Sequence, residues 1–412
     1  FFTRESVLWA AVGSAIDCRS EAPVPSESLS ILVVTGETSG ENHAAGLLKQ
    51  IELHNPQWNF EWFGSGGSQM AAAGVDLLAD VSQLAAIGPW EALAQMGHYW
   101  KLYRRILSQT RKRRPRLALL VDFPEFNLAL ARRLKQMQVP ICYFIGPQVW
   151  AWRPRRINQI KRCVDLMLVI FPFEEEFYRR RGIEAHYVGN PSIALREFLS
   201  KSDNGSHGGT ASSDEPVVAL LPGSRKSEVE QIFPIQLDAA QCVAEHCPAR
   251  FWVIKAPGIA RSQLEAVYEA WLGQGHPRLQ LEIQEEDAPR LLSQVTCAIV
   301  KSGTSTLEAT ILHVPFAMVY RMSWLSWYLT RPLVETKTYC LANLIAGKKI
   351  VPEFVQDQAT GKNIGGYVLE LLKDQSRREE VSRDLEIASE RLGERDAYQE
   401  SAKHISRFLS KE

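Results

Sequence analysis

Two short turns in the second half of the sequence have the residue types that bind a diphosphate. The first, Gly223-Ser224-Arg225, follows the apolar run Val217–Leu221, and the second, Ser302-Gly303-Thr304, follows the run Cys297–Lys301. Each turn precedes a helical pattern, so each offers free backbone N–H groups at the positive end of a helix dipole. Arg225 adds a guanidinium fork that matches phosphate geometry. We therefore expect a nucleotide-sugar diphosphate to bind between these turns.

A carboxylate in the first half is placed to act as a general base. Asp122 ends an apolar run within VDFPEFN (Val121–Asn127). Ligands of open parallel sheets bind beyond the carboxyl ends of the strands, where Asp122 could accept the proton of a substrate hydroxyl. The alternative is an aspartate that only caps the next helix. Asn127 is likewise either a cap or a ligand donor.

Further candidates at the strand ends have structural alternatives. Glu37 and Ser39, in the turn GETSG after the first strand, are assigned with Asn127 to the acceptor side of the site. Glu308 is placed to bind a ribose diol, or to close a capping box with Ser305.

Glu41 and Thr38 also match the capping-box pattern, which needs no ligand. Arg225 could instead form a surface ion pair with Glu228 or Glu230.

The sequence does not favour metal or cofactor chemistry. It contains no Asp-x-Asp pair, no His-Glu-x-x-His motif and no Cys-x-x-Cys pair among its 7 cysteines. Charge on a leaving diphosphate would be met by Arg225, Arg321 and helix N-termini. The cysteines are expected to be reduced thiols of a cytosolic protein. With 47 basic and 47 acidic residues the net charge is zero, and no nucleic-acid partner is expected.

The order of apolar runs predicts an α/β protein of two doubly wound, Rossmann-like domains that face each other across a cleft. Strands alternate with helices from Ser30, and a Gly/Ser-rich linker at residues 201–215 separates two such series. We expect one domain at 29–200 and a second at 216–374, and the family resemblance given below implies that the first is the acceptor side and the second binds the UDP-sugar. A helix within 375–412 should cross back over another surface, and residues 1–28 should form a poorly ordered extension.

One helical pattern could contact a membrane surface. Leu93, Met96, Trp100 and Tyr103 fall on one stripe of the run Trp90–Leu107, before the basic cluster at residues 111–114. A core-facing helix is the alternative, but Trp and Tyr beside basic residues also suit an anionic bilayer. Residues 323–333 form a second aromatic patch. Both segments are too short to span a bilayer.

Eight motifs, in order along the chain, closely resemble the lipid-A-disaccharide synthase family. They are GETSGE (Gly36–Glu41), VDFPEFN (Val121–Asn127), PQVWAWR (Pro147–Arg153), FPFEEEFY (Phe171–Tyr178), LLPGSR (Leu220–Arg225), KSGTSTLE (Lys301–Glu308), YRM (Tyr320–Met322) and NLIAG (Asn343–Gly347). Glu41 departs from the aspartate common in the family.

The resemblance implies a metal-independent GT-B glycosyltransferase of a Gram-negative bacterium, in the cytoplasm and peripherally bound to the inner membrane. Its substrates would be UDP-2,3-diacylglucosamine and 2,3-diacylglucosamine 1-phosphate (lipid X), and a homodimer is left open. The family's essential aspartate falls on Asp122, its phosphate-binding arginine on Arg225 and its donor-site asparagine on Asn343.

Three other functions compete with this interpretation. A UDP-sugar 2-epimerase shares the twin-Rossmann scaffold but would have a polar acceptor side. The aromatic residues of Trp90–Tyr103 and of 323–333 argue instead for an acylated substrate. The glycosyltransferase that acts on lipid I has a glycine-rich first turn in place of GETSGE. In a lipid carrier or scaffold protein, Asp122 and Arg225 would be incidental.

Overall fold

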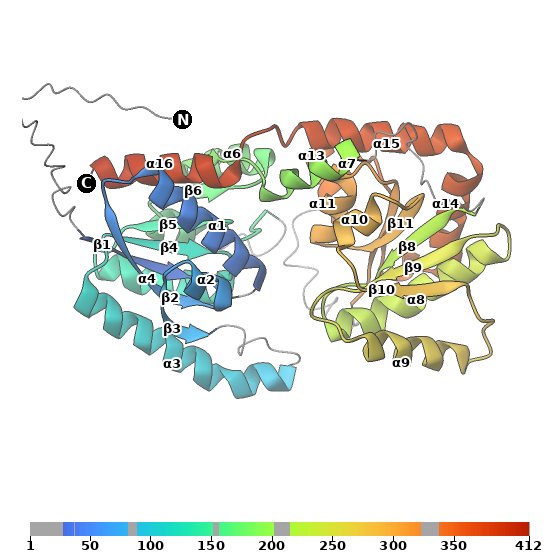
Figure 1. Cartoon of the computed structure of the whole chain (residues 1–412), viewed down its shortest axis with the longest axis horizontal. Helices are drawn as coiled ribbons and strands as arrows, with labels where there is room; N and C mark the ends of the chain where they lie inside the picture. The colour runs from blue at the N-terminus through green and yellow to red at the C-terminus, as the bar shows by residue number, and fades with distance from the viewer. Residues whose placement is uncertain are drawn as a thin grey trace, which may run out of the picture.

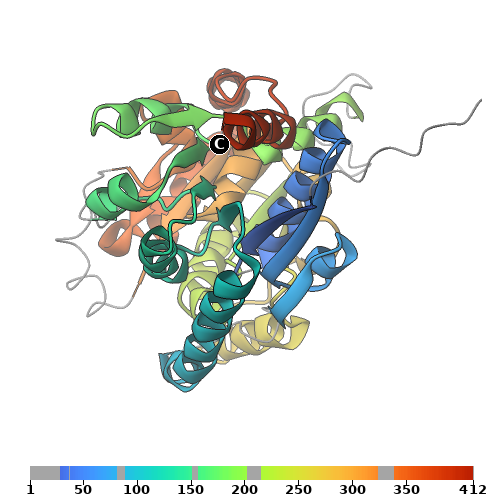
Figure 2. The same cartoon turned by 90° about the vertical axis from the view of Figure 1, so that its left-hand side faces the viewer.

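The computed structural model describes residues 28–36, 38–80, 89–150, 156–201, 215–322 and 338–411, and these form two lobes (Figure 1). Each lobe is built on one parallel sheet. Figure 2, which looks at the first lobe from its end, shows helices on both sides of its sheet. Layers of this kind follow from strands that are apolar on both faces, such as Leu117–Val121, all of whose residues are buried. The predicted fold class is confirmed.

The first sheet has the strand order β3-β2-β1-β4-β5-β6-β7. The chain adds β2 and β3 on one side of β1 and then adds β4 to β7 on the other, so β1 and β4 flank the switch point where ligands bind in such sheets. The strands are β1 (Ser28–Val34), β2 (Asn59–Gly66), β3 (Asp76–Asp80), β4 (Leu117–Val121), β5 (Ile141–Phe144), β6 (Leu166–Val169) and β7 (Ala185–Tyr187).

Helices connect these strands, and a 3-10 helix and a short helix, η3 (Pro191–Arg196) and α7 (Glu197–Lys201), follow β7. The connecting helices are α1 (Thr38–His54), α2 (Ser68–Ala72), α3 (Pro89–Arg113), α4 (Pro124–Gln136), α5 (Ile157–Cys163) and α6 (Pro172–Arg179).

The second sheet repeats the arrangement, with the order β10-β9-β8-β11-β12-β13 and its switch point between β8 and β11. Its strands are β8 (Val217–Leu221), β9 (Arg250–Ile254), β10 (Leu281–Gln284), β11 (Cys297–Lys301), β12 (Phe316–Tyr320) and β13 (Glu353–Val355). The other elements are α8 (Lys226–Ala244), α9 (Arg261–Leu272), α10 (Ala288–Leu292), α11 (Thr304–Ile311), α13 (Leu341–Ala346), η5 (Gln356–Gln358), α14 (Gly361–Lys373), α15 (Gln375–Glu390) and α16 (Ala397–Lys411).

The C-terminal segment differs from the single returning helix that the sequence predicts. α15 lies over the second lobe and α16 over the first (Figure 1). The break falls at Gly393, whose φ of 60° is left-handed. A new helix then begins where the Asp396 carboxylate accepts hydrogen bonds from the N–H groups of Tyr398 and Gln399, at 2.9 and 3.0 Å.

α16 returns to the first lobe because it completes a core there. Ala402, Ile405 and Leu409 of α16 are buried in one cluster with residues of α1 and the first sheet. A separate cluster fills the opposite face of that sheet, under α3, α4 and α5, and a third fills the second lobe. No helix in the described ranges is long and apolar enough to cross a membrane.

Candidate active site

The turn after β4 holds Asp122 in a strained backbone conformation at the carboxyl edge of the first sheet. Asp122 and Phe123 have φ values of 48° and 50°, a region that residues with a side chain rarely occupy. The Asp122 N–H donates to the Phe144 carbonyl at 3.2 Å, and the Asp122 carbonyl accepts from the Tyr143 hydroxyl at 2.7 Å. The cap of α4 is Phe123, so Asp122 is not the helix cap of the alternative interpretation. Strain of this kind gathers at functional sites.

Asn127 braces this turn from within the protein. Its side chain is fully buried, and its Nδ2 donates to the carbonyls of Asp122 at 2.8 Å, Val121 at 3.3 Å and Val34 at 3.4 Å. These bonds join the ends of β1 and β4 at the switch point. The structure therefore gives Asn127 a supporting position under the Asp122 turn, with no exposed surface toward the acceptor side.

Aromatic side chains stand beside the Asp122 turn. The Phe123 ring stacks on Phe126 with centroids 5.2 Å apart, and Tyr99 of α3 lies 5.8 Å from Phe123. Gly36, after β1, lets the two turns approach, because a Cβ there would lie 2.1 Å from the Phe123 ring. The Asp122 turn therefore has an aromatic, apolar wall on one side.

The structure describes two of the four side chains of the expected membrane stripe on α3. Tyr103 packs edge-on against Phe126 with centroids 6.0 Å apart, whereas Trp100 is 59% exposed with the Arg104 guanidinium 4.6 Å from its ring. The side chains of Leu93 and Met96 lie outside the described residues, as does the aromatic patch at 323–333. The membrane stripe therefore stays a prediction, with Trp100 exposed and Tyr103 half-buried one turn farther along α3.

The turn after β1 is only partly described. Glu37 and the Ser39 side chain lie outside the described residues. Glu41 is buried, and its Oε1 accepts from the N–H groups of Gln69 at 2.6 Å and Met70 at 3.3 Å. Glu41 therefore caps α2, a helix from another connection, whereas the capping box with Thr38 stays a prediction, because the Thr38 side chain lies outside the described residues.

In the second lobe, Glu228 links the two turns that the sequence assigns to the diphosphate. Its Oε2 accepts from the Ser224 N–H at 3.0 Å, and its Oε1 accepts from the Lys301 ammonium at 2.8 Å. Arg225 lies farther away, at 3.9 Å from Glu228, with its side chain 67% exposed. The main partner of Glu228 is thus Lys301, and the Arg225 fork is presented to solvent.

The environment of Glu228 keeps its carboxylate ionised. Burial acts to raise its pKa, but the Lys301 ammonium, the Ser224 N–H and Arg225 together hold the pKa below its ordinary value. Gly223 is needed for this turn, because its φ is 122° and a Cβ would lie 2.6 Å from Glu228 Oε2.

The turn after β11 leaves the first amide groups of α11 without a side-chain cap. α11 begins at Thr304 and its cap is Gly303, so the capping box from Ser305 to Glu308 is not formed. Burial raises the pKa of Glu308, with Asp287 adding to the effect, although Ser305 hydrogen-bonds its carboxylate. The Ser302 hydroxyl donates to the Tyr339 carbonyl at 2.9 Å, which ties this turn to the segment before α13.

Asn343 lies within α13 itself and uses its whole amide within the protein. Its Nδ2 donates to the Val351 carbonyl at 2.9 Å and to the Glu353 carboxylate at 2.8 Å, and its Oδ1 accepts from the N–H groups of Ile350 and Val351 at 2.7 and 3.0 Å. Glu353 also accepts from the Tyr339 N–H at 2.9 Å. Tyr339, Asn343 and Glu353 are among the residues that line a polar pocket of about 290 Å³.

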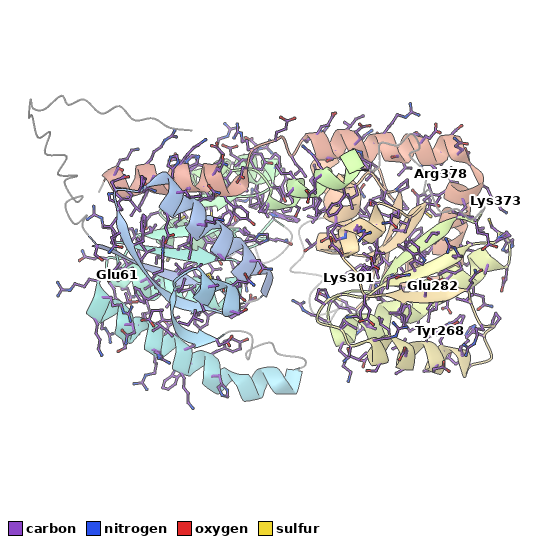
Figure 3. The ribbon with its side chains drawn as sticks, viewed as in Figure 1. Glu61, Tyr268, Glu282, Lys301, Lys373 and Arg378 are labelled. Carbon is purple, nitrogen blue, oxygen red and sulfur yellow. The ribbon has the colours of Figure 1, made fainter. Side chains whose placement is uncertain are left out.

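The structure brings the candidates into two groups, one at the carboxyl edge of each sheet. Asp122 and Asn127 belong to the first, and the two diphosphate turns with Asn343 to the second; Arg321 is exposed directly after β12. Figure 3 shows Lys301, the last residue of β11, on the side of the second lobe that faces the first. Lys301, Glu228 and Glu353 were not among the predicted site residues, because each acts through a partner on a distant segment.

Comparisons with known proteins connect this geometry to a family. The family model for lipid-A-disaccharide synthetase matches residues 31–406. A lipid-A-disaccharide synthase from Myxococcus xanthus (strain DK1622) is 36% identical over 390 residues, which are 92% of this chain and 97% of that protein. One from Anaeromyxobacter dehalogenans (strain 2CP-C) is 37% identical over 365 residues, covering 88% and 93%.

Solved structures with a similar fold are more distant in sequence. A UDP-GlcNAc 2-epimerase from Neisseria meningitidis, bound to UDP-GlcNAc, has a TM-score of 0.60 at 13% identity and covers 93% of this chain and 100% of its own. S. aureus MnaA with UDP has a TM-score of 0.62 at 14% identity, covering 93% and 97%. These likenesses concern the fold alone, whereas the match over residues 31–406 and the relatives above 30% identity place the chain in the lipid-A-disaccharide synthetase family.

Proposed function

We propose that this protein joins UDP-2,3-diacylglucosamine to 2,3-diacylglucosamine 1-phosphate and releases UDP. The product is the β-1,6-linked lipid A disaccharide 1-phosphate. Membership in the lipid-A-disaccharide synthetase family over residues 31–406 is the observation that carries the proposal. Two parallel sheets, each with its own switch point, support it by offering one binding edge for the donor and one for the acceptor.

Asp122 is the proposed general base. It accepts the proton of the acceptor's 6-hydroxyl while that oxygen attacks the anomeric carbon of the donor from the face opposite UDP. The bond between the anomeric carbon and the UDP oxygen breaks in the same displacement, which inverts an α-linked donor into a β-linked product. The strained backbone of the turn, held by Tyr143, Phe144 and Asn127, supports a fixed position for this carboxylate.

The second lobe is the proposed UDP-sugar side. Backbone N–H groups of the turns at Gly223-Ser224-Arg225 and Ser302-Gly303-Thr304 would meet the diphosphate, with Arg225 and Arg321 supplying positive charge. The pair Glu228–Lys301 would fix the spacing between the turns. The amide of Asn343 is already hydrogen-bonded within the protein, so Asn343 would not contact the donor itself. It would position Glu353, which in turn holds the Tyr339 backbone. Glu308 would face the ribose.

The acceptor is acylated, so the protein must meet it at a lipid surface, which we place at the inner membrane. The exposed Trp100 with Arg104 over its ring, on a helix whose last turn holds Arg111, Lys112 and Arg113, supports a peripheral contact through α3. A homodimer is a separate proposal, which rests on the family resemblance and is tested by light scattering.

UDP release tests the proposed reaction directly. The purified protein is mixed with both acylated sugars, and each sugar is then omitted in turn. We expect UDP and a disaccharide only when both are present. UDP release without the acceptor would indicate hydrolysis, and interconversion of a UDP-sugar at C2 without UDP release would indicate an epimerase; either result rejects the proposal.

A further inference from the structure

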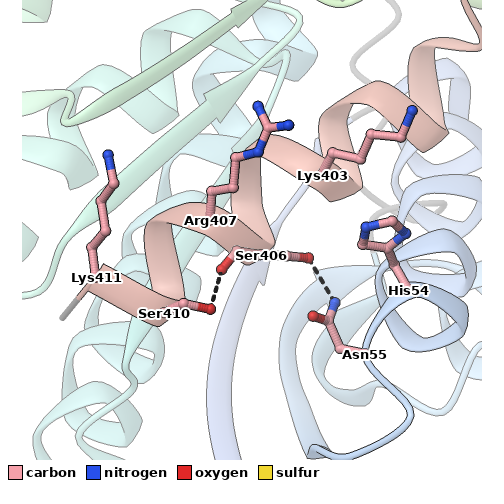
Figure 4. A pocket seen from close by; sticks show the side chains of 7 residues that line it. All are labelled: His54, Asn55, Lys403, Ser406, Arg407, Ser410 and Lys411. Atoms are coloured by element: carbon pink, nitrogen blue, oxygen red, sulfur yellow. Dashed lines mark hydrogen bonds between the residues drawn. The ribbon is translucent and has the colours of Figure 1, made fainter.

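A basic groove lies at the edge of the first sheet that is remote from Asp122. α1 runs back from the carboxyl edge, so its last turn reaches the opposite edge, where α16 crosses it (Figure 4). The hollow between them measures about 530 Å³. Four of its lining side chains are basic: His54 from α1, and Lys403, Arg407 and Lys411, which follow each other at four-residue spacing on α16. Among the described residues that line it there is no carboxylate.

The floor of the groove is built from small polar side chains that hold each other. Asn55 Nδ2 donates to the Ser406 hydroxyl and to the Ile51 carbonyl, both at 2.7 Å, and Ser406 donates in turn to the Ala402 carbonyl at 2.7 Å. Asn55 is 3% exposed and Ser406 is 9% exposed. Because serines stand between the long basic side chains on α16, the space between those side chains stays hollow.

The charge of the groove is largely uncompensated. Lys403 pairs with Glu400 at 2.6 Å, whereas in the described part of the chain His54, Arg407 and Lys411 have no carboxylate within ion-pair distance. Cations in the last turn of a helix also stabilise it through the helix dipole. The helix dipole can explain why Lys411 stands at the end of α16. It does not explain why α1 and α16 form a hollow together, or why α1 contributes His54 to it.

We propose that this groove is a binding site for a phosphate-bearing anion. Guanidinium and ammonium groups around a small hollow are the donors that phosphate oxygens select. Leu53, directly before His54, is 65% exposed, and an apolar side chain next to cations favours the headgroup of an acidic phospholipid as the source of the phosphate. The site is separate from the proposed glycosyl transfer and does not depend on it.

The test compares two double variants that lose the same charge. Arg407→Gln with Lys411→Gln removes two cations of the groove. Arg278→Gln with Lys373→Gln removes two exposed cations from the second lobe, where Lys373 lies at the end away from the first (Figure 3). Affinity is measured for phosphatidylcholine vesicles with and without phosphatidylglycerol, and for inorganic phosphate. We expect roughly 10- to 30-fold weaker binding to the anionic probes in the groove variant alone.

Each outcome decides the proposal. Loss of both vesicle and phosphate binding in the groove variant supports it; loss of vesicle binding alone identifies a lipid source, and loss of phosphate binding alone a soluble one. An equal loss of binding in the control variant would show a general effect of charge and would overturn the proposal. Unchanged binding in the groove variant would also overturn it, and so would a parent protein that binds neither probe. Thermal midpoints check folding, and Lys403→Gln with Lys411→Gln gives an independent second variant. Transfer activity in detergent is expected to stay unchanged.

Discussion

At the scale of single residues, Asp122 carries the sharpest prediction. Asp122→Asn keeps the size of the side chain and the backbone bonds of the turn, and removes only the ability to take a proton. We expect turnover to fall by at least ~10²-fold while UDP affinity stays nearly unchanged. Steady-state kinetics and calorimetric titration with UDP measure the two quantities.

The matched control for this change is Asp76→Asn at the edge strand β3, where the carboxylate pairs with Arg113 at the surface. This control should keep normal turnover, because exposed ion pairs contribute little. If Asp122→Asn also keeps near-normal turnover, Asp122 is not the base.

Glu174 gives a second residue-scale prediction, on the dependence of stability on pH. Its carboxylate accepts from the Trp150 indole N–H and the Phe171 N–H, each at 3.0 Å, in a fully buried position. Burial raises the pKa of Glu174 to about 7 from 4.5, against those hydrogen bonds, which act to lower it. The folded protein therefore binds this proton more tightly than the unfolded chain does.

The free energy of unfolding should consequently fall by about 3 kcal/mol as pH rises from about 4.5 to about 7. Glu174→Gln should remove this part of the pH dependence. Glu175→Gln, at the exposed neighbouring position, should leave it in place. Thermal unfolding of the three proteins across this pH range checks the prediction, and an unchanged slope in Glu174→Gln would contradict it.

Single residues were predictable from the sequence where their function depends on neighbours in the chain. Asp122 and Gly223 stand out at the ends of apolar runs, and both lie in turns with positive φ. The partner of Glu41 is 28 residues away and that of Glu228 is 73 residues away, so periodicity and capping patterns could not find them. Asn343 came from the family resemblance alone, and the structure adds its bond to Glu353.

At the scale of elements, the link between the turns after β8 and β11 can be broken from one side. Lys301→Met leaves the Glu228 carboxylate with the Ser224 N–H and the more distant Arg225. Because the two side chains of the pair are only 17% and 20% exposed, we expect a loss of about 1–3 kcal/mol of stability and weaker UDP binding.

Lys226→Met is the control for this change, since its pair with Glu230 is long, at 3.9 Å, and 54% exposed on both sides. It should change stability by only a few tenths of a kcal/mol. Thermal unfolding and UDP titration of both variants decide the point; equal effects would mean that the pair does not couple the turns.

Elements were predictable where they are apolar throughout. The central strands β4, β8 and β11 match the expected runs because both of their faces are covered. The edge strands β3 (DLLAD) and β13 (EFV) were missed, since partial exposure leaves them short and mixed in character. The C-terminal helix was predicted as one element because a single glycine inside a helical pattern costs only about 1 kcal/mol of helix stability. In the structure Gly393 has a left-handed φ, and the helix breaks there.

At the scale of the whole molecule, the segment between α15 and α16 connects the two lobes through hydrogen bonds from side chains to backbone carbonyls. Arg391 donates to the carbonyls of Ile345 and Ala346 in the second lobe, at 3.1 and 2.6 Å. Four residues later, Arg395 donates to the Tyr187 carbonyl of β7 at 3.1 Å, and the Tyr187 hydroxyl donates to the Leu392 carbonyl at 2.6 Å. The segment therefore fixes the path from one lobe to the other.

Gly189, directly after β7, makes this close approach possible and gives the last prediction. Its φ is 101°, and a Cβ would lie 2.3 Å from the Arg395 carbonyl oxygen. Gly393 has a φ of 60° and nothing within 4 Å of such a Cβ. Gly393→Ala should therefore cost only the backbone penalty of about 1–2 kcal/mol. Gly189→Ala should cost clearly more, because it also displaces the segment that crosses between the lobes.

Thermal unfolding ranks the two variants, and limited trypsin digestion shows where the damage lies. Displacement of the segment should expose Arg391 and Arg395, so Gly189→Ala should be cut there faster than Gly393→Ala or the parent protein. Both substitutions are glycine to alanine at positive φ, so the difference between them reports the contact with Arg395 together with the less favourable φ of Gly189. Equal stability and equal cleavage in the two variants would mean that the crossing segment tolerates displacement and does not fix the lobes.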